Sequence, residues 1–255
     1  MPVNNRPPSV LYKYRPFDIS NEKDLKRTQQ IFEGNVFFNS PLNFNDPIDS
    51  LVPINILDLS TEEKDYYLNQ LVERGFNVTE QHRKNYHSNK MLLSDLEMRK
   101  QLIEQYSVYS LSANKLDWLM WTYYANGHNG IVIGFDTSKF FPGKIFEMNY
   151  RIRIPNTKVI DNDLARMETS LLTKPRDYAH EDEYRVILHD QPAALQTFDI
   201  SSICEILIGY KTSKEAEIII KNLIKANGIS AKIYKVDLPS KPHQKFKLIE
   251  AEYSL

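Results

Sequence analysis

The stretch Asp117-Trp-Leu-Met-Trp-Thr-Tyr-Tyr-Ala-Asn-Gly-His-Asn-Gly-Ile-Val-Ile-Gly-Phe135 decides the fold. Its first part predicts a helix over residues 117–126 that ends at Gly127, because glycine readily adopts the left-handed conformation that closes helices. The apolar run 130–135 then predicts a buried strand. The same order, a polar and aromatic segment followed by an apolar strand, recurs at Lys174-Pro-Arg-Asp-Tyr-Ala-His-Glu-Asp-Glu-Tyr-Arg185.

Similar patterns predict further elements outward from this stretch. Helices grouped between irregularly spaced strands indicate an α+β fold with a mixed, largely antiparallel sheet. We expect a single domain over residues 1–255, with a helical insertion at 60–105 that serves as a cap or a partner surface. Strands are predicted over 10–16, 36–40, 106–112, 146–153, 184–189, 205–209, 232–236 and 246–250, and helices over 21–33, 60–71, 79–105, 162–172 and 213–226.

Length, charge and cysteine content narrow the functional classes. The chain has 255 residues, with 32 Lys and Arg against 33 Asp and Glu, so no global charge points to a nucleic-acid or membrane partner. Cys204 is the single cysteine, which excludes an internal disulfide and a multi-cysteine zinc site. No stretch resembles a signal peptide or a membrane span, and the histidines lack metal-ligand spacing. We therefore expect a cytoplasmic protein without a bound metal.

Four motifs stand out along the chain. They are Leu11-Tyr-Lys-Tyr-Arg15, Ser40-Pro-Leu-Asn-Phe-Asn-Asp-Pro47, Met120-Trp-Thr-Tyr-Tyr-Ala-Asn-Gly-His-Asn-Gly130 and Lys174 through Arg185. In these motifs and their order the chain resembles, from about Leu11 to Tyr210, the uncharacterised bacterial family catalogued as domain of unknown function 2971. The resemblance implies a bacterial or phage origin, where such a domain would act as a toxin or an anti-phage effector.

A second resemblance, to ADP-ribosyltransferases, implies a chemistry. Those enzymes place an Arg or His on an early strand, a Ser or Tyr on the next, and a catalytic Glu on a late strand, often in a Glu-x-Glu pattern. Arg15, Ser40 and Glu181-Asp-Glu183 occur here in that order. The resemblance implies NAD as the substrate, and transfer of ADP-ribose to a protein or nucleic-acid acceptor or to water.

Glu181 and Glu183 are the candidate catalytic carboxylates. On a strand they would point to the same face, because side chains alternate with period two. Cleavage of a nicotinamide glycosidic bond develops positive charge on the ribose, which a nearby carboxylate stabilises. We assign catalysis to Glu183, and orientation of the ribose or the acceptor to Glu181.

Basic, aromatic and amide side chains complete the predicted site. Arg15, Lys174 and Arg185 would hold a diphosphate, although the spacing also suits an ion pair between Arg185 and either glutamate. His128 is a third catalytic candidate, as a general acid or base, or it caps the preceding helix. The aromatic residues would stack on a base or pack in the core. The residues predicted to bind substrate are Tyr12, Tyr14, Arg15, Ser40, Asn45, Asp46, Trp121, Tyr124, Lys174 and Arg185.

Two other functions stay open at this point. A metal-dependent nuclease or phosphodiesterase would gather a cation with Asp46, Asp49, Glu181 and Glu183, although no basic stripe is present to follow a nucleic acid. A non-enzymatic sensor would bind a nucleotide or a protein without turnover. The absence of a G-x-G-x-x-G motif and of a phosphate loop argues against a dehydrogenase or an ordinary nucleoside triphosphatase.

Overall fold

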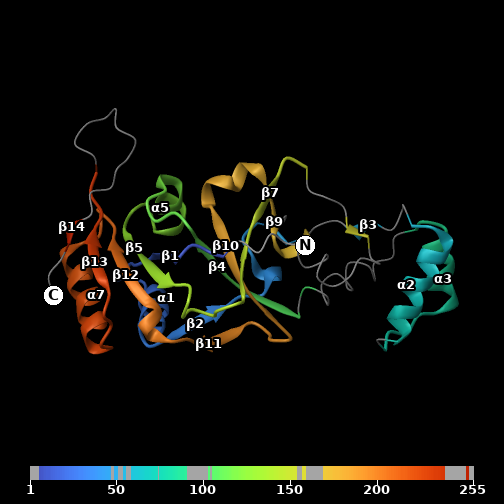
Figure 1. Cartoon of the computed structure of the whole chain (residues 1–255), viewed down its shortest axis with the longest axis horizontal. Helices are drawn as coiled ribbons and strands as arrows, with labels where there is room; N and C mark the ends of the chain where they lie inside the picture. Colours follow the sequence, from blue (N-terminus) through green and yellow to red (C-terminus); the bar gives the residue numbers. More distant parts are fainter. Residues whose placement is uncertain are drawn as a thin grey trace.

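The computed structural model describes residues 6–46, 49–50, 54–55, 59–73, 75–90, 103, 105–153, 157–158, 169–238 and 251–252. Its centre is an eight-stranded sheet with the strand order β14-β13-β12-β5-β1-β4-β10-β6 (Figure 1). The strands of this sheet are β1 (Val10–Pro16), β4 (Tyr106–Ser112), β5 (Gly130–Asp136), β6 (Ile145–Glu147), β10 (Glu183–His189), β12 (Ile203–Ile208), β13 (Lys232–Lys235) and β14 (Ala251–Glu252).

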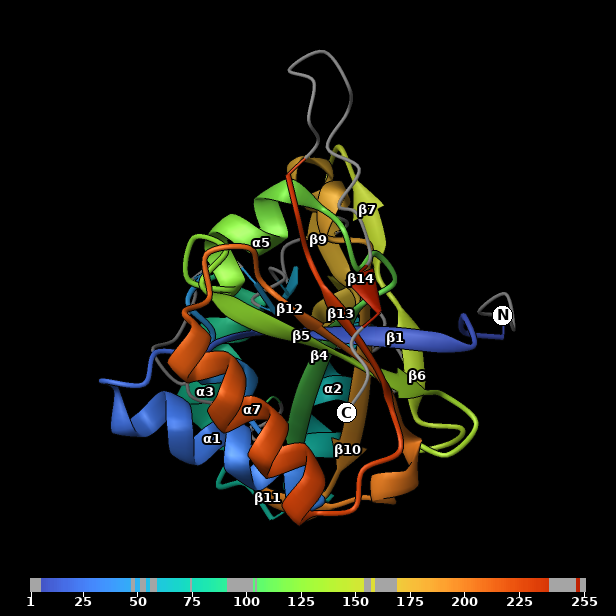
Figure 2. The same cartoon turned by 90° about the vertical axis from the view of Figure 1, so that its left-hand side faces the viewer.

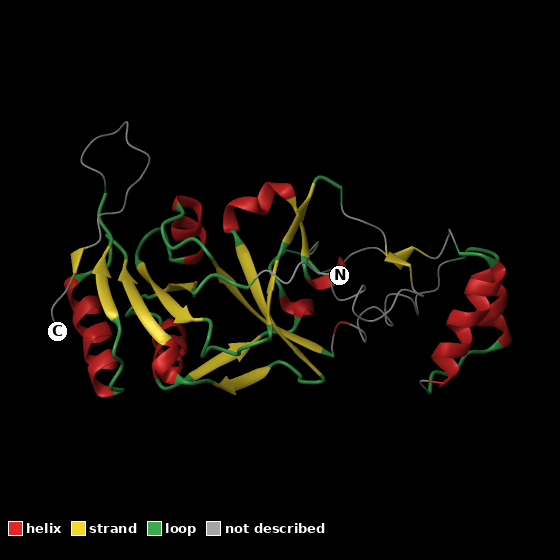
Figure 3. Ribbon diagram, in the orientation of Figure 1, coloured by secondary structure: helices red, strands yellow, loops and turns green. Residues whose placement is uncertain are grey.

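Neighbouring strands of this sheet run antiparallel, apart from the parallel pair of β12 and β13. A parallel pair needs a crossover connection, and helix α7 (Lys214–Ala226) supplies it. Figure 3 shows helices beside this largely antiparallel sheet. The predicted α+β fold with a mixed sheet is therefore confirmed.

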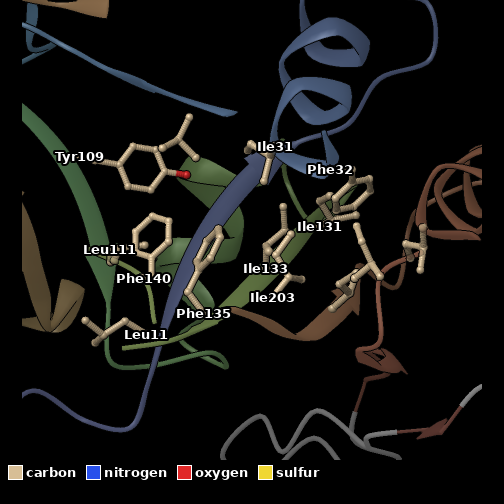
Figure 4. Close-up of a cluster of buried hydrophobic side chains, with 14 of the residues drawn as sticks. Leu11, Ile31, Phe32, Tyr109, Leu111, Ile131, Ile133, Phe135, Phe140 and Ile203 are labelled. Carbon is tan, nitrogen blue, oxygen red and sulfur yellow. The ribbon is translucent and has the colours of Figure 1, made fainter. Parts of the chain in front are cut away.

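Helices cover both faces of the sheet. On one face, α1 (Glu22–Phe32) and α7 lie next to each other (Figure 2) and bury their apolar stripes against β5 and β12. Phe32 of α1 and Ile133 of β5 belong to this core, part of which Figure 4 shows. On the other face, α5 (Trp118–Tyr124) packs Trp121 against Tyr14 of β1. This second cluster fixes α5 over the middle of the sheet.

The sheet is split between β1 and β4. These two strands share one register pair, Tyr12 with Ser112, whereas β1 pairs with β5 over residues 10–16 and β4 pairs with β10 over residues 106–112. β1 and β4 therefore part beyond Tyr12. Lys13 connects the two strands there, since its Nζ donates a hydrogen bond of 2.8 Å to the carbonyl oxygen of Ser110.

Smaller elements lie outside the main sheet. β2 (Asn35–Phe38) pairs with β11 (Ala194–Thr197), β7 (Asn149–Arg151) with β9 (Thr173–Pro175), and β3 (Ile54–Asn55) with β8 (Thr157–Lys158). Short 3-10 helices lie at η1 (Pro41–Asn43), η2 (Arg176–Glu181) and η3 (Ile200–Ser202). The strand predicted over 146–153 is thus wrong in its bounds, because its residues divide between β6 and β7, which belong to different sheets.

The predicted insertion at 60–105 contains two helices, α2 (Thr61–Glu73) and α3 (Glu80–His87). They bury a cluster of their own, built around Leu68 and Tyr86. Residues 91–102 lie outside the described residues, as do most of the helix predicted over 162–172 and the strand predicted over 246–250. The single-domain organisation and the role of the insertion stay predictions.

Candidate functional site

A cavity of about 580 Å³ lies at the split between β1 and β4. Residues of β1, α1, β2, η1, α5, β9 and η2 line it, so the cavity collects side chains from distant parts of the sequence. The predicted motifs do meet here, because Arg15, Asn45, Tyr124, Lys174 and both candidate glutamates are among the lining residues. Its volume falls within the range of about 300–1,000 Å³ that is usual for small-molecule sites.

Lys174 joins the two candidate glutamates at one end of the cavity. Its Nζ lies 2.7 Å from Oε2 of Glu181 and 2.7 Å from Oε2 of Glu183. The other oxygen of Glu181, Oε1, accepts a hydrogen bond of 2.7 Å from the hydroxyl of Tyr124. All three charged side chains are buried, while Tyr124 is 42% exposed. Glu181 therefore stands between the buried lysine and a residue that reaches solvent.

Arg185 is almost completely buried and forms ion pairs with two carboxylates of the same cluster. It donates to both carboxylate oxygens of Asp49, at 2.8 and 2.6 Å, and from Nε to Oε1 of Glu183 at 2.8 Å. It also donates to the hydroxyl of Ser50 and to the carbonyl of Leu171. The geometry thus favours the ion pair over the predicted diphosphate contact for Arg185, because its hydrogen-bonding capacity is taken by the protein.

The buried cluster carries one negative charge in excess. Three carboxylates, those of Asp49, Glu181 and Glu183, face two cations, Lys174 and Arg185. Burial would raise the pKa of Glu183, but the ion pairs with Arg185 and Lys174 outweigh this effect and lower it to about 2. Glu183 is therefore ionised and held from two sides. Among the described residues, Glu181 has Lys174 as its one cationic partner and shares it with Glu183, so the excess negative charge lies closest to Glu181.

Glu181 does not lie on a strand, which corrects the geometry expected from the Glu-x-Glu spacing. It is the last residue of η2, and β10 begins at Glu183. Asp182 between them is left-handed, with φ of 44°, a conformation that Asp tolerates better than most residues. The hydroxyl of Ser112 fixes the bend by donating to the carbonyl of Glu181 at 2.6 Å. The two carboxylates still converge, but through this turn and not through strand alternation.

Three cations also line the cavity. Lys13 and Arg15 lie on the same face of β1, and Arg27 of α1 is an electrostatic neighbour of Arg15. Nε and Nη2 of Arg15 are buried and have no hydrogen-bond partner among the described residues, and the same holds for the hydroxyl of Tyr109. Buried donors of this kind are costly unless they meet an acceptor. A guanidinium in this state, beside a cavity, suits an anionic ligand.

The same surroundings lower the pKa of Lys13. Its Nζ lies 4.5 Å from the centroid of the Tyr109 ring, in a cation–π position. Burial and the nearby charge of Arg15 lower the pKa of Lys13 to about 7, although Glu183 acts in the opposite direction. Lys13 therefore changes charge within the physiological range.

Several predicted residues occupy other positions. Trp121 is fully buried and donates from Nε1 to the carbonyl of Lys115, which makes it a core residue and does not support the predicted stacking on a ligand. Tyr14 packs edge-on against Trp121 and bonds to the carbonyl of Asn114. The hydroxyl of Tyr12 likewise bonds to Glu205. Both tyrosines border the cavity, but their rings belong to the core cluster on the α5 face.

His128 and Ser40 also lie apart from the carboxylates. His128 is buried at the turn after α5, with its ring 4.0 Å from that of Trp118, and burial lowers its pKa. Ser40 caps η1, where its hydroxyl accepts from the backbone N–H of Leu42 at 3.3 Å. Neither residue is among those that line the cavity. These positions favour structural roles over the predicted catalytic and substrate-binding ones.

Three residues that line the cavity were not predicted from the sequence, namely Lys13, Arg27 and Tyr109. Asn45 and Asp46, which were predicted to bind substrate, line it as well. A signal for Lys13 existed in the sequence, because it alternates with Leu11 and Arg15 on one face of a predicted strand. Two cations on the face that also carries a core leucine are unusual, and they mark that face as functional.

The described residues contain no group of three or more His, Cys, Asp or Glu side chains arranged to hold a metal ion. Among the acidic residues of the cavity, the Nζ of Lys174 occupies the position between Glu181 and Glu183. In the described part of the chain, no helix is both long and apolar enough to cross a membrane.

Comparison with known proteins finds a family model that is similar to part of the chain. Residues 120–186 match the family model described as a protein of unknown function, DUF2971. This segment carries two of the four motifs, including Tyr124, Lys174, Glu181 and Glu183, and the match confirms the resemblance over that range. No curated protein and no solved structure matches the chain.

Proposed function

We propose that the cavity binds a nicotinamide dinucleotide and that the protein transfers or hydrolyses its ADP-ribosyl group. The observation that carries the proposal is the presence of an acidic end and a basic end in one cavity. The acidic end is formed by the carboxylates around Lys174, and the basic end by Arg15, whose buried donors have no partner among the described residues and whose electrostatic neighbours include Arg27 of α1. NAD has the complementary pair of charges, a cationic nicotinamide riboside and an anionic diphosphate.

The basic end supports binding of the diphosphate. Arg15 offers buried N–H groups that have no acceptor in the described part of the chain, and such a fork suits phosphate oxygens. Lys13 and Arg27 add charge beside it. Lys174, which the sequence also suggested for this role, is instead bound by the two glutamates. We therefore assign diphosphate binding to Arg15, with Lys13 and Arg27 as its neighbours.

The acidic end supports cleavage of the glycosidic bond. As the bond between nicotinamide and C1′ of the ribose breaks, its electron pair passes to the nicotinamide nitrogen and positive charge develops on the ribose. Glu181 carries the excess negative charge and would stabilise that ribose. A water molecule or an acceptor then attacks C1′ and releases its proton to bulk water, so that the products are the ADP-ribosyl compound, neutral nicotinamide and a proton. Glu183, held by Arg185 and Lys174, fixes the position of Lys174 and through it that of Glu181.

This division of roles differs from the one predicted from the sequence, which gave catalysis to Glu183. Both oxygens of Glu183 accept from buried cations of the protein. One oxygen of Glu181 instead faces Tyr124 near solvent. The carboxylate with fewer cationic partners keeps more of its negative charge for the substrate.

Incubation of the purified protein with NAD tests the proposal. We expect nicotinamide to be released together with free or acceptor-bound ADP-ribose, with or without magnesium and with candidate protein or nucleic-acid acceptors. Arg15→Gln should weaken ADP-ribose binding in calorimetry by about tenfold to a hundredfold, the range typical of a lost charged hydrogen bond. Absence of both NAD binding and nicotinamide release under all these conditions would contradict the proposal.

The state of Lys13 predicts a pH dependence of binding. Below pH 7 the lysine is protonated and attracts the diphosphate, and as the pH rises through about 7 the free protein loses this charge. ADP-ribose should therefore bind more weakly at pH 8.5 than at pH 6, by up to about tenfold per pH unit. The diphosphate itself does not titrate in this range. Calorimetry with Lys13→Arg, which keeps the charge, should show a flat profile, and an unchanged slope in that variant would rule out Lys13 as the source.

A further inference from the structure

The face of β2 that borders the cavity carries an alternation of amides and one aromatic ring. Asn35, Phe37 and Asn39 line the cavity, whereas Val36 and Phe38 point into the core with at most 1% exposure. Phe37 is 52% exposed. The alternation follows from the period of two along a strand. It presents one flat ring flanked by hydrogen-bonding groups.

Further amides join this face from neighbouring elements. Gln30 of α1, and Asn43 and Asn45 of the η1 region, also line the cavity, and Asn43 lies beside Asn39. The side-chain N–H groups of Asn35 and Asn39 bond to backbone carbonyls of Glu33 and Asn43, which orients these two amides. Uncharged donors and acceptors beside an aromatic ring are the features that recognise a nucleobase, since the ring stacks and an Asn or Gln can bond two atoms of an adenine edge.

The order of features along the sheet shows which part of a ligand would reach this wall. Glu183, Ser112 and Tyr12 lie opposite one another on β10, β4 and β1. Arg15 lies about 10 Å further along β1, at roughly 3.3 Å per residue, and its side chain leaves the opposite face of the strand from that of Tyr12. Lys13 connects the two regions where β1 and β4 part, because it interacts electrostatically with both Glu183 and Arg15. Arg15 interacts electrostatically with Asp24 and Arg27 of α1. Carboxylates, cations and amides thus follow in the order of ribose, diphosphate and base.

We propose that Phe37 and the amides around it bind the adenine base of the dinucleotide. The inference rests on the proposed function, which places the nicotinamide riboside at Glu181 and the diphosphate at Arg15. A base of a small nucleotide fits better than a base of a nucleic acid, because the chain is nearly neutral, with a net charge of −1, and lacks a basic stripe for a polynucleotide backbone.

Comparison of two substrates tests this assignment. Nicotinamide mononucleotide has the scissile bond but no adenosine, so a base subsite affects NAD alone. Phe37→Ala should raise the KM for NAD on the order of tenfold, through loss of stacking, and leave turnover of the mononucleotide unchanged. The matched control is Leu195→Ala, because Leu195 of β11 pairs with Phe37 of β2 and is similarly exposed, at 47%. This variant should leave the KM and the turnover of both substrates unchanged.

The outcomes separate this inference from the proposed function. If Phe37→Ala raises the KM for both substrates equally, or leaves the KM for NAD unchanged, the base subsite is overturned. Nicotinamide release by these proteins would still support the proposed function. If the protein releases no nicotinamide, calorimetry with adenosine monophosphate still decides. Binding that Phe37→Ala weakens and Leu195→Ala does not supports the subsite, and equal binding by all three proteins overturns it. If a poly(A) oligonucleotide binds more tightly than adenosine monophosphate, the dinucleotide base subsite is also overturned, in favour of a subsite for a nucleic-acid base.

Discussion

Replacement of Arg185 by methionine is expected to lower the free energy of unfolding by about 3–5 kcal/mol. The guanidinium is 1% exposed and bonds to Asp49 and Glu183. Methionine would leave Asp49 buried with Lys174, at 3.5 Å, as its remaining ion-pair partner. Loss of one member of a buried ion network costs far more than the network contributes in net terms, because a desolvated charge is left behind.

Chemical denaturation of the two proteins measures this effect. Arg83→Met is the matched control, since Arg83 pairs with Asp65 at 3.9 Å on the surface of the helical pair, where both side chains are substantially exposed. A surface pair of this kind contributes about 0–1 kcal/mol. Adding Asp49→Asn to Arg185→Met should restore part of the lost stability, because the unpaired carboxylate is removed. A loss below about 1 kcal/mol in Arg185→Met would show that the buried network does not hold the site together.

Replacement of Glu181 by glutamine is expected to reduce the rate of nicotinamide release at saturating NAD by about 100- to 1,000-fold. Glutamine has nearly the shape of glutamate and keeps an oxygen that can accept from Tyr124, but it removes the negative charge that faces the ribose. The KM for NAD should change little, because Arg15 and its neighbours supply most of the binding. A fall in kcat without a rise in KM is the signature of an interaction made in the transition state.

Two further variants give this measurement its controls. Glu217→Gln alters a carboxylate of α7 that pairs with Lys235 and does not border the cavity, so it should leave nicotinamide release unchanged. Glu183→Gln should lower both activity and thermal stability, because Glu183 bonds to Lys174 and Arg185. Wild-type turnover in Glu181→Gln, together with a stable but inactive Glu183→Gln, would return the catalytic role to Glu183.

The strongly periodic elements could be predicted from the sequence. The stripe of Ala216, Ile220 and Ile224 identified α7, and the run from Gly130 to Phe135 identified β5, because burial on a regular element leaves a regular pattern. The split between β1 and β4 could not be predicted in this way. It depends on where two strands stop pairing, and the spacing of apolar residues within either strand does not record that point.

The sequence indicated several residues of the site but not how they come together. Lys174, Glu181 and Glu183 stood out as a dense polar group, and they do meet. The two glutamates converge because Asp182 between them is left-handed. The Glu-x-Glu pattern predicted a strand and did not indicate this turn. Trp121 and His128 were misleading for another reason. Aromatic and imidazole rings serve a core as readily as a ligand, and sequence alone does not give their burial.

The most direct test of the central claim is a crystal structure of the Glu181→Gln variant with NAD, since this variant should bind the substrate without consuming it. We expect a dinucleotide in the cavity between β1 and β4, with its nicotinamide riboside beside the substituted side chain at position 181 and its diphosphate bonded to the guanidinium of Arg15. NAD bound elsewhere, or in the reverse direction with its diphosphate away from Arg15, would contradict the account.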